Sequence, residues 1–164
     1  MRIAGKGLQV TGISVINQHK SYSLNERLVK KIAAHILKFC KTRRPIELEL
    51  IFLDDRSIKI LNKKYKGRDR ATDVLAFNID RRDFGRDANL AEAYISIDRA
   101  AENAEIYGTR LEEELFLYVI HAILHIAGYD DGSAAARGKM LEKQYEILSY
   151  LWKKENLSKV LMPR

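Results

Sequence analysis

The chain has 164 residues, of which 46% are hydrophobic and 31% are charged, as in a globular protein with a sizeable core. Its net charge of +7 favours a polyanionic partner, with nucleic acid first and an acidic membrane surface second. The absence of an 18-residue apolar run excludes an ordinary membrane span, and the single cysteine, Cys40, excludes an internal disulfide and a thiolate-rich metal site. We therefore expect one domain over residues 1–164 in the reducing cytoplasm.

Two strands and one helix are expected in the first third of the chain. The alternation over residues 10–16 indicates a strand. Ser23 and Glu26 have the spacing of a capping box, and apolar residues then recur at helical spacing, which predicts a helix that ends before Pro45. Residues 46–52 alternate between glutamates and apolar side chains, so we expect a strand with one solvated face.

Short elements follow in the middle of the chain. Either Asp54 or Asp55 can cap a short helix. The apolar stretch 72–77 predicts a short buried strand, and the polar segment 78–89 predicts a long surface loop. A further strand is expected over residues 93–97.

The second half of the chain is expected to be mainly helical. Asp98 is the expected cap of a helix that Gly108 ends. Thr109 and Glu112 again have capping-box spacing, and they precede the most apolar helix of the sequence. A last amphipathic helix is expected over residues 134–154.

Two histidines lie four residues apart within the apolar helix. Side chains at positions i and i+4 project from one helix face, so His121 and His125 form a two-point clamp for a metal. Gly128 predicts a helix stop, after which the chain can bring Asp130 or Asp131 back toward the histidines. The alternative is a core histidine pair satisfied by backbone or carboxylate partners. The pattern H-x-x-x-H-x-x-G-x-x-D has the layout of zincin metalloproteases and favours the metal.

One residue of the zincin pattern is replaced. A metalloprotease carries glutamate directly after its first histidine as the general base, and this chain has Ala122 at that position. Peptide hydrolysis of the usual kind is therefore disfavoured.

The densest positive segment spans residues 63–70 and interleaves one aromatic residue, Tyr65, with basic ones. A solvated loop and an RNA-contacting edge are both consistent with this composition. Under the second interpretation the RNA-binding residues are Lys63, Lys64, Lys66, Arg68 and Arg70.

Two stretches resemble segments of the YbeY endoribonucleases, bacterial factors of ribosomal RNA maturation. Residues 65–77 are similar to the family segment Y-R-G-x-D-x-P-T-[DN]-V-L-S-F, and residues 121–131 are similar to H-G-x-L-H-L-x-G-Y-D-H. The resemblance extends from about residue 10 to residue 152. It implies an α+β fold with a small mixed sheet of about four strands, about five helices around it and a zincin-like metal helix.

Four positions depart from the family segments. Ala71 replaces proline and Ala122 replaces glycine, which are small changes. Asp131 stands in place of the third histidine, and aspartate is an acceptable ligand for zinc that also admits iron, manganese or nickel. Lys66 stands in place of arginine, so it keeps the positive charge and loses the bidentate contact with phosphate.

The resemblance implies a metal-dependent endoribonuclease that acts in ribosomal RNA maturation and ribosome quality control. Its implied metal ligands are His121, His125 and Asp131, with Zn²⁺ the first candidate, and its implied catalytic residues are Lys66 and His121. Asp130 is expected to orient one of the metal ligands without binding the metal itself, and Asp73 is a weaker candidate for the same role.

Two other functions are consistent with these residues. A small metallohydrolase could act on another substrate through the same ligands. A non-catalytic RNA-binding or ribosome-binding assembly factor would need only the basic surface. The expected partner is RNA, with ribosomal RNA or the ribosome first, and neither DNA nor a membrane is expected.

Overall fold

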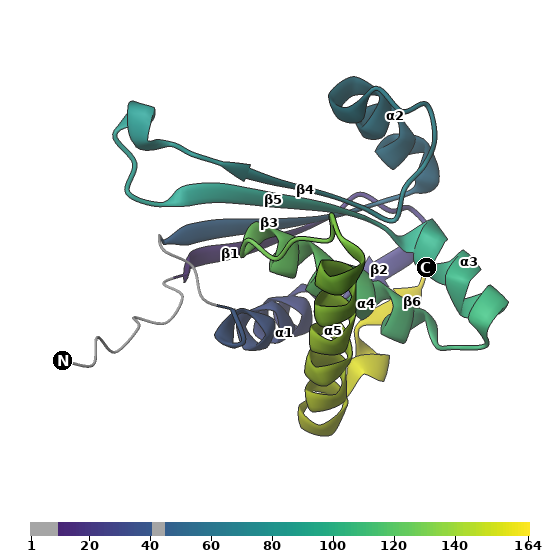
Figure 1. The fold of residues 1–164 in the computed structure, drawn as a ribbon. Coiled ribbons are helices and arrows are strands. Elements are labelled where there is room, and N and C mark those ends of the chain that lie inside the picture. The colour runs from purple at the N-terminus through teal and green to yellow at the C-terminus, as the bar shows by residue number, and fades with distance from the viewer. Residues whose placement is uncertain (1–9, 41–44) are drawn as a thin grey trace.

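A four-stranded sheet forms the centre of the computed structural model, which describes residues 10–40 and 45–164 (Figure 1). Strands β1, β3 and β5 run parallel, and β4 joins β5 antiparallel at one edge. In spatial order the strands are β1 (Val10–Asn17), β3 (Ile46–Leu53), β5 (Asn89–Ser96) and β4 (Val74–Ile79). The sheet is mixed, as expected.

Five α-helices surround this sheet within the described residues. They are α1 (Glu26–Lys38), α2 (Asp55–Lys66), α3 (Ile97–Tyr107), α4 (Leu111–Ile126) and α5 (Ala134–Lys154). Helix α2 lies over one face of the sheet, while α1, α4 and α5 lie on the other side (Figure 1). The predicted α+β class is confirmed, and none of the described helices has the length and apolarity needed to cross a membrane.

Strand β3 contributes buried apolar side chains to both faces of the sheet. Leu48, Leu50 and Phe52 are buried in the large core beneath α1 and α4. The opposite face carries partly exposed glutamates early in the strand, as predicted, but it then carries Ile51 and Leu53, which pack beneath α2. Full burial of each such side chain stabilises the fold by about 1.5 to 3 kcal/mol.

Strand β4 differs from its prediction. It is an edge strand in which Leu75 is the only buried residue, so it is not the buried strand expected over residues 72–77. It also extends to Ile79, and the short 3-10 helix η1 (Arg82–Phe84) occupies the connection to β5. The expected loop over residues 78–89 is therefore the tip of a β-hairpin.

Helix α1 begins later than the capping-box spacing predicts. Asn25 is the N-cap, and its side-chain oxygen accepts a hydrogen bond from the backbone N–H of Leu28 at 3.1 Å. Ser23 instead lies in the short strand β2 (Tyr22–Leu24), which pairs with β6 (Leu161–Pro163). Strand β6 follows the short 3-10 helix η2 (Leu157–Lys159) near the end of the chain. The prediction failed because this pairing joins segments that lie far apart in the sequence.

The expected caps of α3 and α4 are also wrong. Ser96, rather than Asp98, accepts the hydrogen bond from the first turn of α3, because β5 runs directly into the helix. Helix α4 begins after Arg110 without a side-chain cap. The hydroxyl of Thr109 donates to the carboxylate of Glu114 at 2.7 Å, and Arg110 rather than Thr109 occupies the N-cap position.

Candidate metal centre and nucleic-acid cleft

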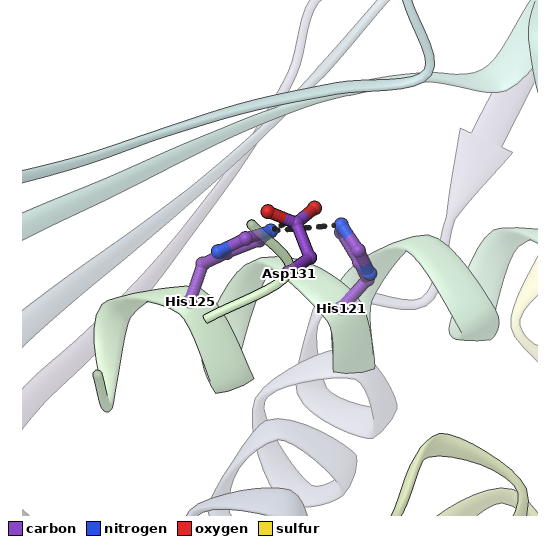
Figure 2. A group of neighbouring side chains, drawn as sticks. All are labelled: His121, His125 and Asp131. Atoms are coloured by element: carbon purple, nitrogen blue, oxygen red, sulfur yellow. Dashed lines mark hydrogen bonds and ion pairs between the residues drawn. The ribbon is translucent and has the colours of Figure 1, made fainter. Parts of the chain in front are cut away.

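The two histidines face each other across one turn of α4. His121 Nε2 and His125 Nε2 are 3.0 Å apart, and both side chains are partly exposed (Figure 2). The remaining faces of this part of α4 are buried in the core through Ile120, Ile123 and Leu124. Core packing therefore leaves the two imidazoles on one accessible face of the helix.

The turn after α4 returns a carboxylate to the histidines. Gly128 has a φ of 96°, a conformation that costs glycine little, and the next residue, Tyr129, donates its N–H to the carbonyl of Leu124 at 3.0 Å. The chain then places Asp131 Oδ2 3.4 Å from His125 Nε2. Figure 2 shows the carboxylate between the two imidazole rings.

Asp130 contacts the loop that carries Asp131 rather than the histidines. Its Oδ1 accepts a hydrogen bond from the backbone N–H of Gly132 at 2.9 Å, and no histidine contact of this carboxylate occurs among the described residues. Asp130 thus shapes the loop that carries Asp131. Of the two aspartates that the sequence leaves open, Asp131 is the one that reaches the histidines.

The donor atoms have the spacing that a metal requires. Ligands 2.0 to 2.1 Å from a tetrahedral Zn²⁺ lie about 3.3 Å from one another. The measured separations are 3.0 Å between the imidazoles and 3.4 Å from His125 to Asp131, and all three ligand atoms lie within 4.8 Å of one another. Two ring nitrogens at 3.0 Å must share a proton or a cation, so His121, His125 and Asp131 fit a divalent metal.

Gln144 of α5, which the sequence did not single out, contacts this group through His121. Its Oε1 lies 2.8 Å from His121 Nδ1. An amide oxygen can only accept a hydrogen bond, so Nδ1 carries the proton and Nε2 presents its lone pair to the metal position. The available signal was the place of this polar residue on the apolar stripe of α5, four residues after the buried Met140 and three before the buried Ile147.

A cleft of about 580 Å³ extends from the histidines over the edge strand β4 to the loop after α2. Its wall includes Lys66 and Arg68 from the basic segment, together with the backbone and side chains of most of β4. Asp73 also lines the cleft, but its carboxylate accepts hydrogen bonds from Thr72 and Val74 at the start of β4. The fold therefore brings two of the five predicted RNA-binding residues into the cleft that contains the metal centre.

The other three basic residues lie beside this cleft on the exposed surface. Lys63 pairs with Asp69 at 3.3 Å, and the ammonium of Lys64 lies 5.0 Å from the ring of Tyr65. Arg70 is exposed and does not line the cleft. These residues can add positive charge to the approach without reaching the histidines.

A buried asparagine holds the basic loop in place. Asn62 is 2% exposed, and its side-chain N–H donates to the carbonyl of Arg70 at 2.8 Å. Gly67 ends α2 with a φ of 67°, so the chain turns between Lys66 and Arg68. The two cations of the cleft are therefore positioned by the end of a helix rather than by a loose loop.

Comparisons with known proteins identify the family of this chain. The profile of the family described as Endoribonuclease YbeY matches residues 14–152. Curated proteins named Endoribonuclease YbeY are similar: the one from Oenococcus oeni is 35% identical over 74% of this chain and 83% of its own length, and the one from Petrotoga mobilis is 34% identical over 86% and 96%. The solution structure of TM1509 from Thermotoga maritima aligns with a TM-score of 0.57 and 27% identity over 87% of this chain and 90% of that one. The chain belongs to the YbeY endoribonuclease family.

Proposed function

We propose that this protein is a metal-dependent endoribonuclease that cleaves RNA phosphodiester bonds during ribosomal RNA maturation. The observation that carries this proposal is the convergence of three metal-ligand atoms within 4.8 Å in a cleft that Lys66 and Arg68 also line. Family membership supports the class of reaction. A ribosomal RNA substrate would place the protein in the cytoplasm, and one domain over residues 1–164 would carry the activity.

The metal would be held by His121 Nε2, His125 Nε2 and an oxygen of Asp131. Zn²⁺ is the first candidate, and the carboxylate also suits iron or manganese. When bound, such a metal supplies a Lewis acid and lowers the pKa of a water molecule toward about 7. Three protein ligands are the number found in catalytic rather than structural zinc sites.

Lys66 is the residue that we assign to the developing charge of the phosphoryl group. Its ammonium is a compact charge on a flexible stem, and it lines the same cleft as the histidines. Arg68 would hold a second phosphate oxygen or the neighbouring phosphate. Lys63, Lys64 and Arg70 would attract the RNA backbone, because each phosphate contact releases condensed counterions.

Peptide hydrolysis through the same ligands is disfavoured by a specific observation. Ala122, at the position of the zincin glutamate, is completely buried in the core. No carboxylate can therefore act from that position as a general base. A role in RNA binding without cleavage would use the basic surface and leave the histidines without a function.

The proposal is tested by measuring metal content and RNA cleavage on the same preparation. The purified protein is analysed for bound elements, stripped with a chelator and reconstituted with Zn²⁺ or Mn²⁺. Cleavage of a 5′-labelled RNA should be lost with the metal and return with it. Full cleavage by verified metal-free protein would contradict the proposal, and so would stoichiometric metal with no cleavage of any ribosomal RNA fragment.

A further inference from the structure

Three aromatic rings form a row on the α2 side of the edge strand. We call Tyr65, Phe77 and Tyr94 the aromatic row; they come from α2, β4 and β5, respectively. The ring centroids of Tyr65 and Phe77 are 5.2 Å apart, and those of Phe77 and Tyr94 are 6.1 Å apart. Tyr65, at the open end of the row, is 52% exposed. About half of the surface of Tyr65 therefore remains accessible to a ligand.

The aromatic row adjoins the cleft of the metal centre. Phe77 lines this cleft together with His121 and His125. Side chains alternate across a strand, so Phe77 projects to the α2 face, while Asn78 projects to the α4 face and donates to the carbonyl of Ile126 at 3.3 Å. The metal centre and the aromatic row therefore lie on opposite faces of a single edge strand, and the cleft connects them across it.

Positive charges accompany the exposed rings. The ammonium of Lys64 lies 5.0 Å from the centroid of Tyr65, and that of Lys66 lies 5.6 Å from the centroid of Phe77. Aromatic rings flanked by cations are the arrangement with which proteins bind single-stranded nucleic acid, because bases stack on the rings and phosphates contact the cations. An apolar partner surface would not be matched by two lysines at the rings.

Tyr94 forms the closed end of the row. Its hydroxyl donates to the carboxylate of Glu92 at 3.2 Å, and burial, reinforced by this carboxylate, raises the pKa of Tyr94 to about 12. Tyr94 is therefore a neutral ring that supports Phe77 from behind. The face available to a ligand is at Tyr65 and Phe77.

We infer that Tyr65 and Phe77 form a subsite for one unpaired nucleobase of the RNA, on the far side of β4 from the scissile phosphate. This inference rests on the proposed function, because it requires an RNA strand at the metal centre. The base stacks on Tyr65, and Lys66, which lines the cleft and lies beside Phe77, stands between this subsite and the scissile phosphate. Base pairing keeps a base inside its own helix, so the subsite selects single-stranded RNA at this position.

The test is a binding experiment on metal-free protein, in which cleavage cannot interfere. The ligand is a fluorescent single-stranded oligoribonucleotide, together with a series in which one abasic nucleotide is moved along the strand. Tyr65→Ala should weaken binding of the intact strand roughly 5- to 150-fold, the range that base stacking on an aromatic ring provides. One abasic position should weaken wild-type binding by a similar factor, and it should cause no further loss in Tyr65→Ala.

Three control variants separate stacking from other effects. Tyr65→Phe keeps the ring and should bind like wild type, and Tyr65→Leu keeps apolar packing on Phe77 and should lose affinity as alanine does. Tyr107→Ala removes a tyrosine that is 69% exposed on α3 and should not change RNA affinity. Thermal unfolding of each variant establishes that it is folded.

The inference would be overturned if every abasic position weakened RNA binding by the same factor in Tyr65→Ala as in wild type, because the ring and the base would then act independently. Unchanged RNA affinity in both Tyr65→Ala and Tyr65→Leu would also overturn it and would leave the aromatic row as a contact for a protein. These outcomes are separate from the proposed function. The coupling between ring and base can be present when metal-dependent cleavage is absent, and cleavage can be present without the coupling.

Discussion

Replacing Gln144 should weaken metal binding although this side chain is not a metal ligand. In the wild-type protein its Oε1 accepts the Nδ1–H of His121 at 2.8 Å and so keeps the lone pair of Nε2 directed at the metal position. Gln144→Leu retains the shape of the side chain and removes the acceptor. The imidazole of His121 can then rotate or carry its proton on Nε2, and both changes oppose metal binding.

The size of the effect follows from the environment of this hydrogen bond. Loss of a partner that orients a metal-binding histidine costs about 10- to 100-fold in affinity. His121 is partly exposed, so water can replace some of the lost hydrogen bond. We therefore expect a loss near the lower end, about tenfold, which corresponds to about 1.4 kcal/mol.

The assay is a competition between the protein and a chromophoric chelator of known Zn²⁺ affinity. Gln144→Glu keeps an acceptor at the same place and should bind Zn²⁺ at least as tightly as wild type. Glu142→Ala serves as the matched control, because it removes an exposed side chain from the same helix. Equal Zn²⁺ affinity in wild type and Gln144→Leu would refute the role assigned to Gln144.

Three further predictions concern separate parts of the structure. Lys66→Ala should lower kcat, and a wild-type kcat in this variant at saturating RNA would contradict the catalytic assignment. Lys64→Ala should instead raise KM, and it should reduce the slope of log affinity against log salt concentration by about 0.7. Asp131→Ala should lose stoichiometric metal, and Asp130→Ala should retain more of it, as elemental analysis will show; the reverse order would mean that the wrong aspartate was assigned. Hydrogen bonds from Ser57 lower the pKa of Asp54, the N-cap of α2, below 3.8. The ionised carboxylate therefore stabilises the folded protein fully above pH 3.8, and this contribution is lost as the pH falls through the lowered pKa. Asp54→Ala should therefore cost about 1 kcal/mol at pH 7 and progressively less in acid, as denaturant unfolding will show; a cost that does not change with pH would contradict this assignment.

Local patterns predicted the elements well because they depend on residues that are close in the sequence. The i, i+4 spacing of His121 and His125 determines their common face whatever the rest of the fold does, and Gly128 has the positive φ that its place after the helix suggested. The alternation predicted the two faces of β3 correctly in its first half, whereas Ile51 and Leu53 in its second half are buried on the face expected to be solvated. Asp54 was one of two candidates for the cap of α2, and it is the residue that accepts the hydrogen bond.

The errors and omissions involve contacts between distant segments. Ser23 could not be recognised as a strand residue because its partner, Met162, lies near the other end of the chain. Gln144 resembles any polar residue of an amphipathic helix until α5 is packed against α4. The rings of Phe77 and Tyr65 lie close together only because β4 occupies the sheet edge beneath α2. No local sequence pattern indicates this position of β4.

We propose that His121 and His125 of α4 hold the metal on which RNA cleavage depends. This proposal is tested most directly by single-turnover cleavage of RNA with His125→Ala, with metal content measured on the same sample. His35→Ala is the control, because His35 contacts Glu155 at 3.1 Å and takes no part in the metal centre. We predict that His125→Ala loses both stoichiometric metal and cleavage, while His35→Ala keeps both. Cleavage at the wild-type rate by metal-free His125→Ala would contradict the account.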